Sequence, residues 1–204
     1  MPDTSSVPKE ASHATAQENS DASTKIAFDD EADFERARRG LIATLPEGKV
    51  TIDSQTVWDC SQYDFLRENS SAPDTVHPGL WRQGRLNAIH GLFEVMDGVW
   101  QVRGYDISNL TLVAGKTGWI LIDVLTTAAT AKACLELANE HLGARPVRAV
   151  IYTHSHADHF GGILGVTTAE EVERGQVRII APEGFLEEVV NENVIAGAAM
   201  ARRA

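Results

Sequence analysis

The sequence predicts a layered α/β fold, and three observations support this prediction. Residues 92–102 read as two short strands around Asp97-Gly98, a dipeptide typical of tight hairpin turns. Residues 119–124 and 147–153 are two apolar runs, and residues 126–142 between them have the apolar spacing of a helix. An antiparallel start followed by alternating strands and helices is typical of domains in which helices cover a sheet.

The first helix is expected to begin among the acidic residues after Asp29 and to end near Thr44. Phe34, Ala37 and Leu41 recur at helical spacing, with acidic residues before them and three arginines among them. This order of charges complements the helix dipole. We interpret the arginines as a solvated helix face, with an anion-binding site as the alternative.

A second block begins near Leu80 with a short helical pattern. The Asp97-Gly98 turn of the hairpin that follows is expected to be of type I′, which needs positive φ angles at both central residues. The remaining expected elements are strands at 107–114 and 119–124, a helix at 126–142, strands at 147–153 and 177–181, and a helix at 183–191. Cys134 lies on the apolar stripe of the long helix and is expected to be a core residue.

The composition excludes several classes of function. The chain has 204 residues, with 29 Asp and Glu against 18 Lys and Arg, and a formal net charge of −11. Because nucleic-acid binding depends on clustered basic residues, this balance argues against a nucleic-acid partner. No apolar run approaches the roughly 18 residues of a membrane-spanning helix.

The cysteines and the N-terminus favour a cytoplasmic protein. Cys60 and Cys134 are the two cysteines, without any CxxC, which gives neither a disulfide framework nor a thiolate zinc site. The first residues lack the basic start and apolar run of a secretory signal. A periplasmic or secreted location is the alternative if the true start differs. Residues 1–25 have almost no large apolar side chain and are expected to form a disordered tail.

The most informative segment is His154-Ser-His-Ala-Asp-His159, which follows the apolar strand 147–153 and precedes Gly161-Gly162. His154, His156 and Asp158 are spaced by two, so an extended loop can direct them to one side, whereas His159 points elsewhere. Imidazole and carboxylate groups are ligands for Zn²⁺, with Mn²⁺ or Fe²⁺ as possible substitutes. The alternative interpretation is a solvated polar loop with incidental metal affinity.

This HxHxDH motif resembles the metal-binding motif of the metallo-β-lactamase superfamily, whose αββα sandwich holds one or two metals at the edge of its sheets. Further stretches resemble the alkyl sulfatase branch, whose members degrade dodecyl sulfate. They are Trp81–Asn87, Gly91–Val95, Gln101–Thr111 and Asn193–Ala204. The resemblance covers about residues 30–204. It implies a lead-in segment at 26–79 and the N-terminal portion of the catalytic domain at 80–204.

The resemblance implies that His154 and His156 bind one zinc ion and that Asp158 and His159 bind the other. Family members add two acidic ligands and a later His, but the other histidines here, at 13, 77, 90 and 141, all precede the motif. None of these four is assigned to the metal site. Four side chains do not complete two catalytic zinc sites. The chain is therefore expected to be the N-terminal part of a longer enzyme and to be inactive by itself.

The activity implied for the whole enzyme is that of a sulfuric ester hydrolase. Metal-activated water would convert a linear primary alkyl sulfate into an alcohol and sulfate. The expected partners are an amphiphilic sulfate ester as substrate and a second copy of the protein, in a homodimer that forms through regions missing from this chain. One alternative is another hydrolase that shares HxHxDH, such as a thioesterase or lactonase; the acidic charge argues against the nucleases. A further alternative is a noncatalytic metal-binding or interaction protein.

Overall fold

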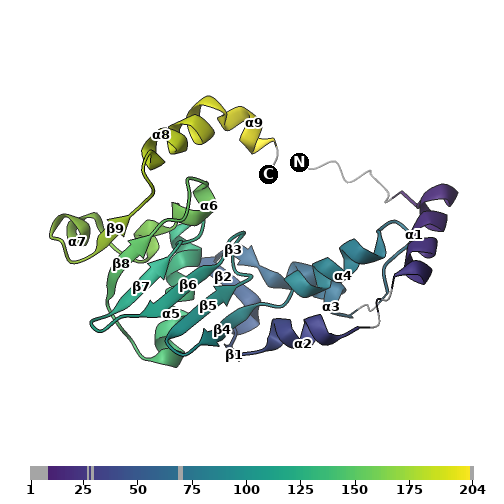
Figure 1. The fold of residues 1–204 in the computed structure, drawn as a ribbon, viewed down its shortest axis with the longest axis horizontal. Helices are drawn as coiled ribbons and strands as arrows, with labels where there is room; N and C mark the ends of the chain where they lie inside the picture. The colour runs from purple at the N-terminus through teal and green to yellow at the C-terminus, as the bar shows by residue number, and fades with distance from the viewer. Residues whose placement is uncertain (1–8, 27, 29, 69–70, 203–204) are drawn as a thin grey trace. The chain divides into compact units, whose positions relative to one another are not determined.

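The computed structural model of the chain describes residues 9–26, 28, 30–68 and 71–202 and is shown in Figure 1. By their contacts, the residues group into two compact units. One comprises residues 1–38 and 63–89, and the other comprises residues 39–62 and 90–204. The segment boundaries expected after residues 25 and 79 remain predictions.

The first unit is helical and contains α1 (His13–Lys25), α2 (Ala32–Arg38), α3 (Asp64–Glu68) and α4 (Pro78–Asn87). Helix α1 occupies much of the segment for which a disordered tail is expected. It begins at the N-cap Ser12 and has no buried residue, so it adds nothing to an apolar core. Residues 1–8 of that segment lie outside the described residues.

Helix α2 ends at Arg38, so the expectation that it continues to about Thr44 is wrong. Gly40 has a φ of 78°, a left-handed conformation that interrupts a helix. A side chain at Gly40 would also collide with the carbonyl oxygen of Glu94. The next residues form strand β1 (Leu41–Ala43), which pairs antiparallel with β4.

The second unit is built around a seven-stranded mixed sheet with the order β1-β4-β5-β6-β7-β8-β9. The strands up to β7 pair antiparallel, whereas β7, β8 and β9 are parallel. Their bounds are Gly91–Met96 (β4), Val99–Arg103 (β5), Leu110–Ala114 (β6), Trp119–Ile122 (β7), Val147–Ile151 (β8) and Arg178–Ile180 (β9). A separate antiparallel pair, β2 (Lys49–Ile52) and β3 (Gln55–Asp59), was not expected from the sequence.

The predicted hairpin is present as β4 and β5, with Met96 opposite Val99. Its turn differs from the expectation. Gly98 has a φ of 77°, but Asp97 does not have a positive φ. The turn is therefore not of type I′, which requires positive φ at both positions.

Helix α5 (Ala128–Leu142) lies against the sheet (Figure 1). Apolar side chains of the helix and of the sheet form one core. The Thr127 hydroxyl caps the N-terminus of α5 by accepting from the Thr130 amide. Cys134 is 1% exposed, which confirms that it is a core residue, and burial raises the pKa of its thiol. Among the described residues, no helix is both long and apolar enough to cross a membrane.

The chain after β8 contributes short helices. These are α6 (Ala157–Phe160), α7 (Ala169–Glu173), α8 (Phe185–Val190), the π-helical turn η4 (Asn191–Ile195) and α9 (Gly197–Ala201). Phe185 at the start of α8 stacks on Tyr152, with ring centroids 5.3 Å apart. This contact joins α8 to the residue that follows β8.

Candidate metal centre

The four predicted ligands lie on the loop that leaves the end of β8. His154 precedes helix α6, His156 is its N-cap, and Asp158 and His159 lie within it. The strand brings the chain to the edge of the parallel part of the sheet, and the short helix then turns it back. The four side chains therefore lie within six residues of one another, on the loop and on the short helix α6.

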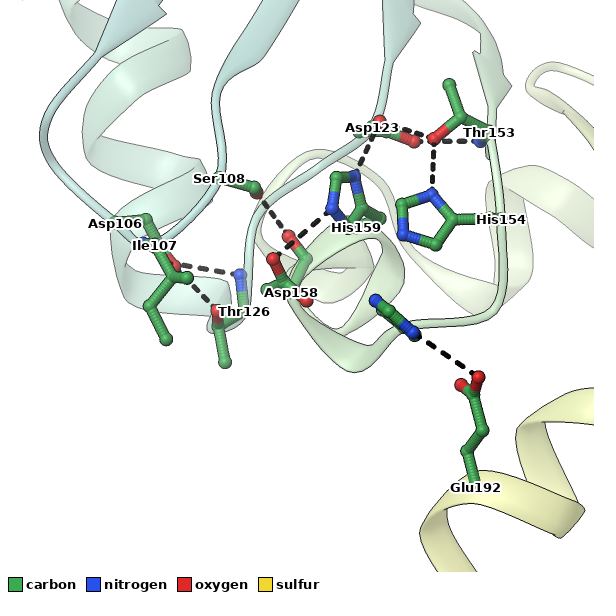
Figure 2. A network of polar contacts seen from close by, with 11 residues as sticks. Asp106, Ile107, Ser108, Asp123, Thr126, Thr153, His154, Asp158, His159 and Glu192 are labelled. Carbon is green, nitrogen blue, oxygen red and sulfur yellow. Dashed lines mark hydrogen bonds and ion pairs between the residues drawn. The ribbon is translucent and has the colours of Figure 1, made fainter. Parts of the chain in front are cut away.

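The structure brings these side chains together, as Figure 2 shows for the three that it labels. The ring centroid of His154 lies 4.0 Å from that of His159 and 4.6 Å from that of His156. His159 Nε2 lies 3.2 Å from Asp158 Oδ2. Three imidazoles and one carboxylate thus form a single polar cluster.

Asp123, directly after β7, holds this cluster from the sheet side. Its carboxylate accepts from the Thr153 amide at 2.8 Å and from the Thr153 hydroxyl at 2.8 Å, and its Oδ2 lies 2.7 Å from His159 Nδ1. The carboxylate can only accept, so Nδ1 of His159 carries the proton. A neutral His159 has a single N–H, and the shorter contact takes it: Nδ1 lies 2.7 Å from Asp123 Oδ2, whereas Nε2 lies 3.2 Å from Asp158 Oδ2 and keeps the lone pair.

The same reasoning shows which ring nitrogen of His154 carries the proton. The Thr153 hydroxyl has one hydrogen, which it donates to Asp123. Its contact with His154 Nδ1 at 2.9 Å therefore requires that Nδ1 donates. His154, like His159, keeps its lone pair on Nε2. A hydrogen bond on one ring nitrogen that leaves the other free for a cation is a common arrangement at metal sites.

The turn between β7 and α5 supports the loop through backbone contacts. The Val124 amide donates to the His159 carbonyl at 2.9 Å, and the Gly162 amide donates to the Leu125 carbonyl at 2.9 Å. Gly162 is required here, because a side chain would collide with the Val124 carbonyl oxygen. Asp123 and Leu125 have φ values of 56° and 64°, a strained conformation that such tight packing sustains.

A second buried carboxylate braces the same turn (Figure 2). Asp106 is 7% exposed and accepts from the Thr126 amide at 3.1 Å and from the hydroxyls of Thr126 and Thr130. Two residues later, the Ser108 hydroxyl donates to the Asp158 carbonyl. The segment after β5 is thus tied both to the β7–α5 turn and to the metal-binding loop.

Glu192 reaches the loop from the π-helical turn η4. Its Oε1 lies 3.3 Å from His156 Nε2, and its Oε2 accepts from the Ser155 hydroxyl at 3.1 Å. The Glu192 side chain is 28% exposed and that of His156 is 50% exposed. His156 therefore contacts a residue outside the four predicted ligands through Nε2, whereas His154 and His159 contact such residues through Nδ1.

The donor set fits a divalent metal in its chemistry. Two ligands of a tetrahedral ion with bonds of about 2.0 to 2.1 Å lie about 3.3 Å apart, close to the 3.2 Å between His159 Nε2 and Asp158 Oδ2. Within the described ranges, however, no group of three or more His, Cys, Asp or Glu side chains is spaced to hold a metal ion. The metal role of the four residues remains a prediction.

The other histidines have separate surroundings. His77 caps α4, with Nδ1 accepting from the Gly79 amide at 3.1 Å. His141 lies in the last turn of α5, where a cation favours the helix dipole. His90 packs edge-on against Tyr105, and His13 is the first residue of α1.

Three acidic residues that contact the loop or its supporting turn were not predicted from the sequence: Asp106, Asp123 and Glu192. Asp123 had one usable signal, since it is an acidic residue at the end of an apolar strand and parallel strands place such residues at one edge of the sheet. Asp106 and Glu192 lie in polar segments that resemble many solvated ones. Their roles follow from contacts with residues between 20 and 37 positions away in the sequence.

Comparison with known proteins agrees with this geometry. The family model described as "Metallo-beta-lactamase superfamily" matches residues 103–198. The matched range includes the whole loop and its supports Asp106, Asp123 and Glu192. The expected metallo-β-lactamase-like α/β fold is thereby confirmed.

Similarity to alkylsulfatases extends over almost the whole chain. A linear primary-alkylsulfatase from Pseudomonas sp. is 49% identical over 197 residues, which is 96% of this chain. An (R)-specific secondary-alkylsulfatase from Pseudomonas sp. is 48% identical over 195 residues. The solved structure of the inverting sec-alkylsulfatase Pisa1 from Pseudomonas sp. matches with a TM-score of 0.89 and 48% identity over 96% of this chain.

These matches confirm the resemblance to the alkylsulfatases. They also show that the chain spans a limited part of its relatives. It covers 29% of each of the two Pseudomonas sequences and 31% of the Pisa1 chain.

Proposed function

We propose that the protein to which this chain belongs hydrolyses alkyl sulfate esters, with linear primary alkyl sulfates such as dodecyl sulfate as substrates. The observation that carries the proposal is the 48–49% identity to alkylsulfatases over 96% of the chain, a span that includes the His-Asp loop. The two relatives have names that refer to primary and to secondary esters. Their nearly equal identities do not separate these substrates, so the preference for primary esters rests on the sequence resemblance.

In this proposal, Asp158 and His159 hold one metal ion, and His154 and His156 hold the other. Zn²⁺ is the proposed metal, since a divalent cation suits imidazole and carboxylate donors. When bound, the metal supplies the Lewis acidity that activates water for attack on the ester. Asp123 and Thr153 keep the Nδ1 protons of His159 and His154 away from the cations.

A second candidate function is metal binding without hydrolysis, and a specific observation favours it for the 204-residue chain. The loop offers two side chains to each of two metal ions, whereas a catalytic zinc usually has about three protein ligands. We therefore expect little or no sulfatase activity from the chain by itself. A protein extended to the length of the alkylsulfatase relatives should be active.

Sulfate release from dodecyl sulfate, measured with added Zn²⁺, tests both functions. The extended protein should hydrolyse the ester, and His154→Ala should abolish turnover at ordinary zinc concentrations. His141→Ala is the matched control, because it removes an imidazole at the end of α5, and it should retain activity. An extended protein that binds two zinc ions but releases no sulfate would favour a thioesterase or lactonase. Turnover by the 204-residue chain equal to that of the extended protein would contradict the ligand count.

We further propose that the active protein is a cytoplasmic homodimer. Size-exclusion chromatography with light scattering on the extended protein tests the dimer, and fractionation of the source cells tests the location.

A further inference from the structure

The ring nitrogen through which His156 contacts a residue outside the four predicted ligands differs from that of the other two imidazoles in the loop. His154 and His159 are contacted on Nδ1, by partners that lie beside the strands β8 and β7. His156 is contacted on Nε2, by Glu192, which lies 36 residues later in the sequence. We propose that Glu192 is a positioning residue that fixes the tautomer and orientation of His156, so that its Nδ1 faces the metal. This inference rests on the metal-binding part of the proposed function.

The two contacts of the Glu192 carboxylate support this role. Glu192 Oε2 accepts from the Ser155 hydroxyl at 3.1 Å, and Oε1 lies 3.3 Å from His156 Nε2. An ionised carboxylate only accepts, so a neutral imidazole that donates to Glu192 carries its proton on Nε2. The lone pair of His156 is then on Nδ1, the opposite assignment from His154 and His159. Two contacts to adjacent loop residues also restrict rotation of the imidazole.

The position of Glu192 is itself fixed by packing. Phe185, at the start of α8, stacks on Tyr152 at 5.3 Å and packs edge-on against Phe160 at 5.4 Å. Tyr152 and Phe160 lie on either side of the His-Asp loop in the sequence. The helix that leads to Glu192 is therefore anchored on the same segment whose imidazole Glu192 contacts. Figure 2 shows Glu192 directed from its helical turn toward the loop.

Glu192 lies in the π-helical turn η4 (Asn191–Ile195). A π turn inserts an additional residue into a helix, changes the direction of the side chains around it, and is frequent at functional sites. Glu192 is the second residue of this turn. Outer partners of metal-binding imidazoles typically change metal affinity by about 10-fold to 100-fold when they are removed.

The first experiment needs neither metal nor turnover. Long-range ¹H–¹⁵N NMR spectra of the 204-residue chain at about pH 8.5, where a model imidazole is neutral, report which ring nitrogen carries the proton. We expect His156 with its proton on Nε2 in the wild type and in Glu192→Gln, whose amide oxygen still accepts. Glu192→Ala should give a mixture of tautomers. Glu188→Ala, which removes an exposed carboxylate one helical turn earlier, should not change the spectrum.

The second experiment measures Zn²⁺ affinity of the same variants by competition with a chromophoric chelator. Glu192→Ala should weaken binding by about 10-fold to 100-fold, while Glu192→Gln and Glu188→Ala should remain within about threefold of the wild type. Equal losses in Glu192→Gln and Glu192→Ala would overturn the proposal, since they would indicate a charge effect or direct ligation. An unchanged tautomer of His156 in Glu192→Ala would also overturn it.

The two readouts separate this inference from the proposed function. A wild-type chain that binds no Zn²⁺ contradicts the metal site and, with it, the role of Glu192. A chain that binds Zn²⁺ equally well with and without Glu192 contradicts the positioning role alone. Circular dichroism of each variant tests whether the fold is retained. The Ser155→Ala variant removes the second contact of the Glu192 carboxylate. Its Zn²⁺ affinity should fall in the same direction as that of Glu192→Ala, but by less.

Discussion

Removal of the Asp123 carboxylate should destabilise the chain measurably, because three donors converge on it. Thr153 contributes its amide and its hydroxyl, and His159 contributes Nδ1. The Asp123 side chain is 10% exposed and that of His159 is 21% exposed, whereas Thr153 is exposed. Water can therefore replace the carboxylate at Thr153 but replaces it poorly at His159.

The expected loss in the free energy of unfolding follows from these exposed fractions. Each replaced donor on Thr153 costs about 0.5 kcal/mol, and the imidazole donor, which loses a charged partner, costs about 2 kcal/mol. Asp123 also has a φ of 56°, where alanine is less favourable than aspartate or asparagine by roughly 1 kcal/mol. Asp123→Ala should lower the free energy of unfolding by about 4 kcal/mol in total. Asp123→Asn keeps one acceptor oxygen and tolerates the backbone angle, so it should cost about 1 to 2 kcal/mol.

Urea denaturation of the metal-free 204-residue chain, followed by tryptophan fluorescence and circular dichroism, measures both values. Zn²⁺ competition on the same proteins should show a loss of about 10-fold to 100-fold for Asp123→Ala. A decrease of less than 1 kcal/mol for Asp123→Ala would refute the reasoning, since it would show that the three donors do not depend on this carboxylate. Equal effects of Asn and Ala would refute the contribution of the backbone angle.

Two further predictions concern packing and pH. Gly162→Ala should destabilise the chain by about 2 to 3 kcal/mol, because its methyl group would collide with the Val124 carbonyl and lie 2.8 Å from Ala131 Cβ. The control is Gly197→Ala in α9, where nothing lies within 4 Å of the added methyl group. In the same urea assay, the control should not lower the free energy of unfolding. Burial raises the pKa of Tyr152 to about 12, so the unfolded state, with a phenol pKa of about 10, loses its proton first and the free energy of unfolding should fall between about pH 10 and pH 12. Urea titrations at several pH values should show a smaller fall in Tyr152→Phe, and an identical fall would contradict this assignment.

The parts of the fold that depend on local pattern were predictable. The apolar run before His154 became β8, and the apolar stripe around Cys134 became the buried face of α5, because both signals repeat within a few residues. The end of helix α2 was not predictable in this way. Leu41 fits the helical spacing of Phe34 and Ala37, but the left-handed Gly40 and pairing with Phe93 place it in a strand. Pairing with a residue 52 positions away has no local signature.

The candidate site shows the same division between local and distant information. The HxHxDH loop could be recognised because its four side chains lie within six residues of sequence. The groups that decide the protonation of those side chains come from the ends of β7 and β8 and from a turn after α8. A short motif therefore identifies the ligand atoms that are available, whereas the fold decides which nitrogen of each imidazole offers its lone pair. For His154, His156 and His159 the assignments proposed here are Nε2, Nδ1 and Nε2, and the contact with Glu192 is what sets the middle one.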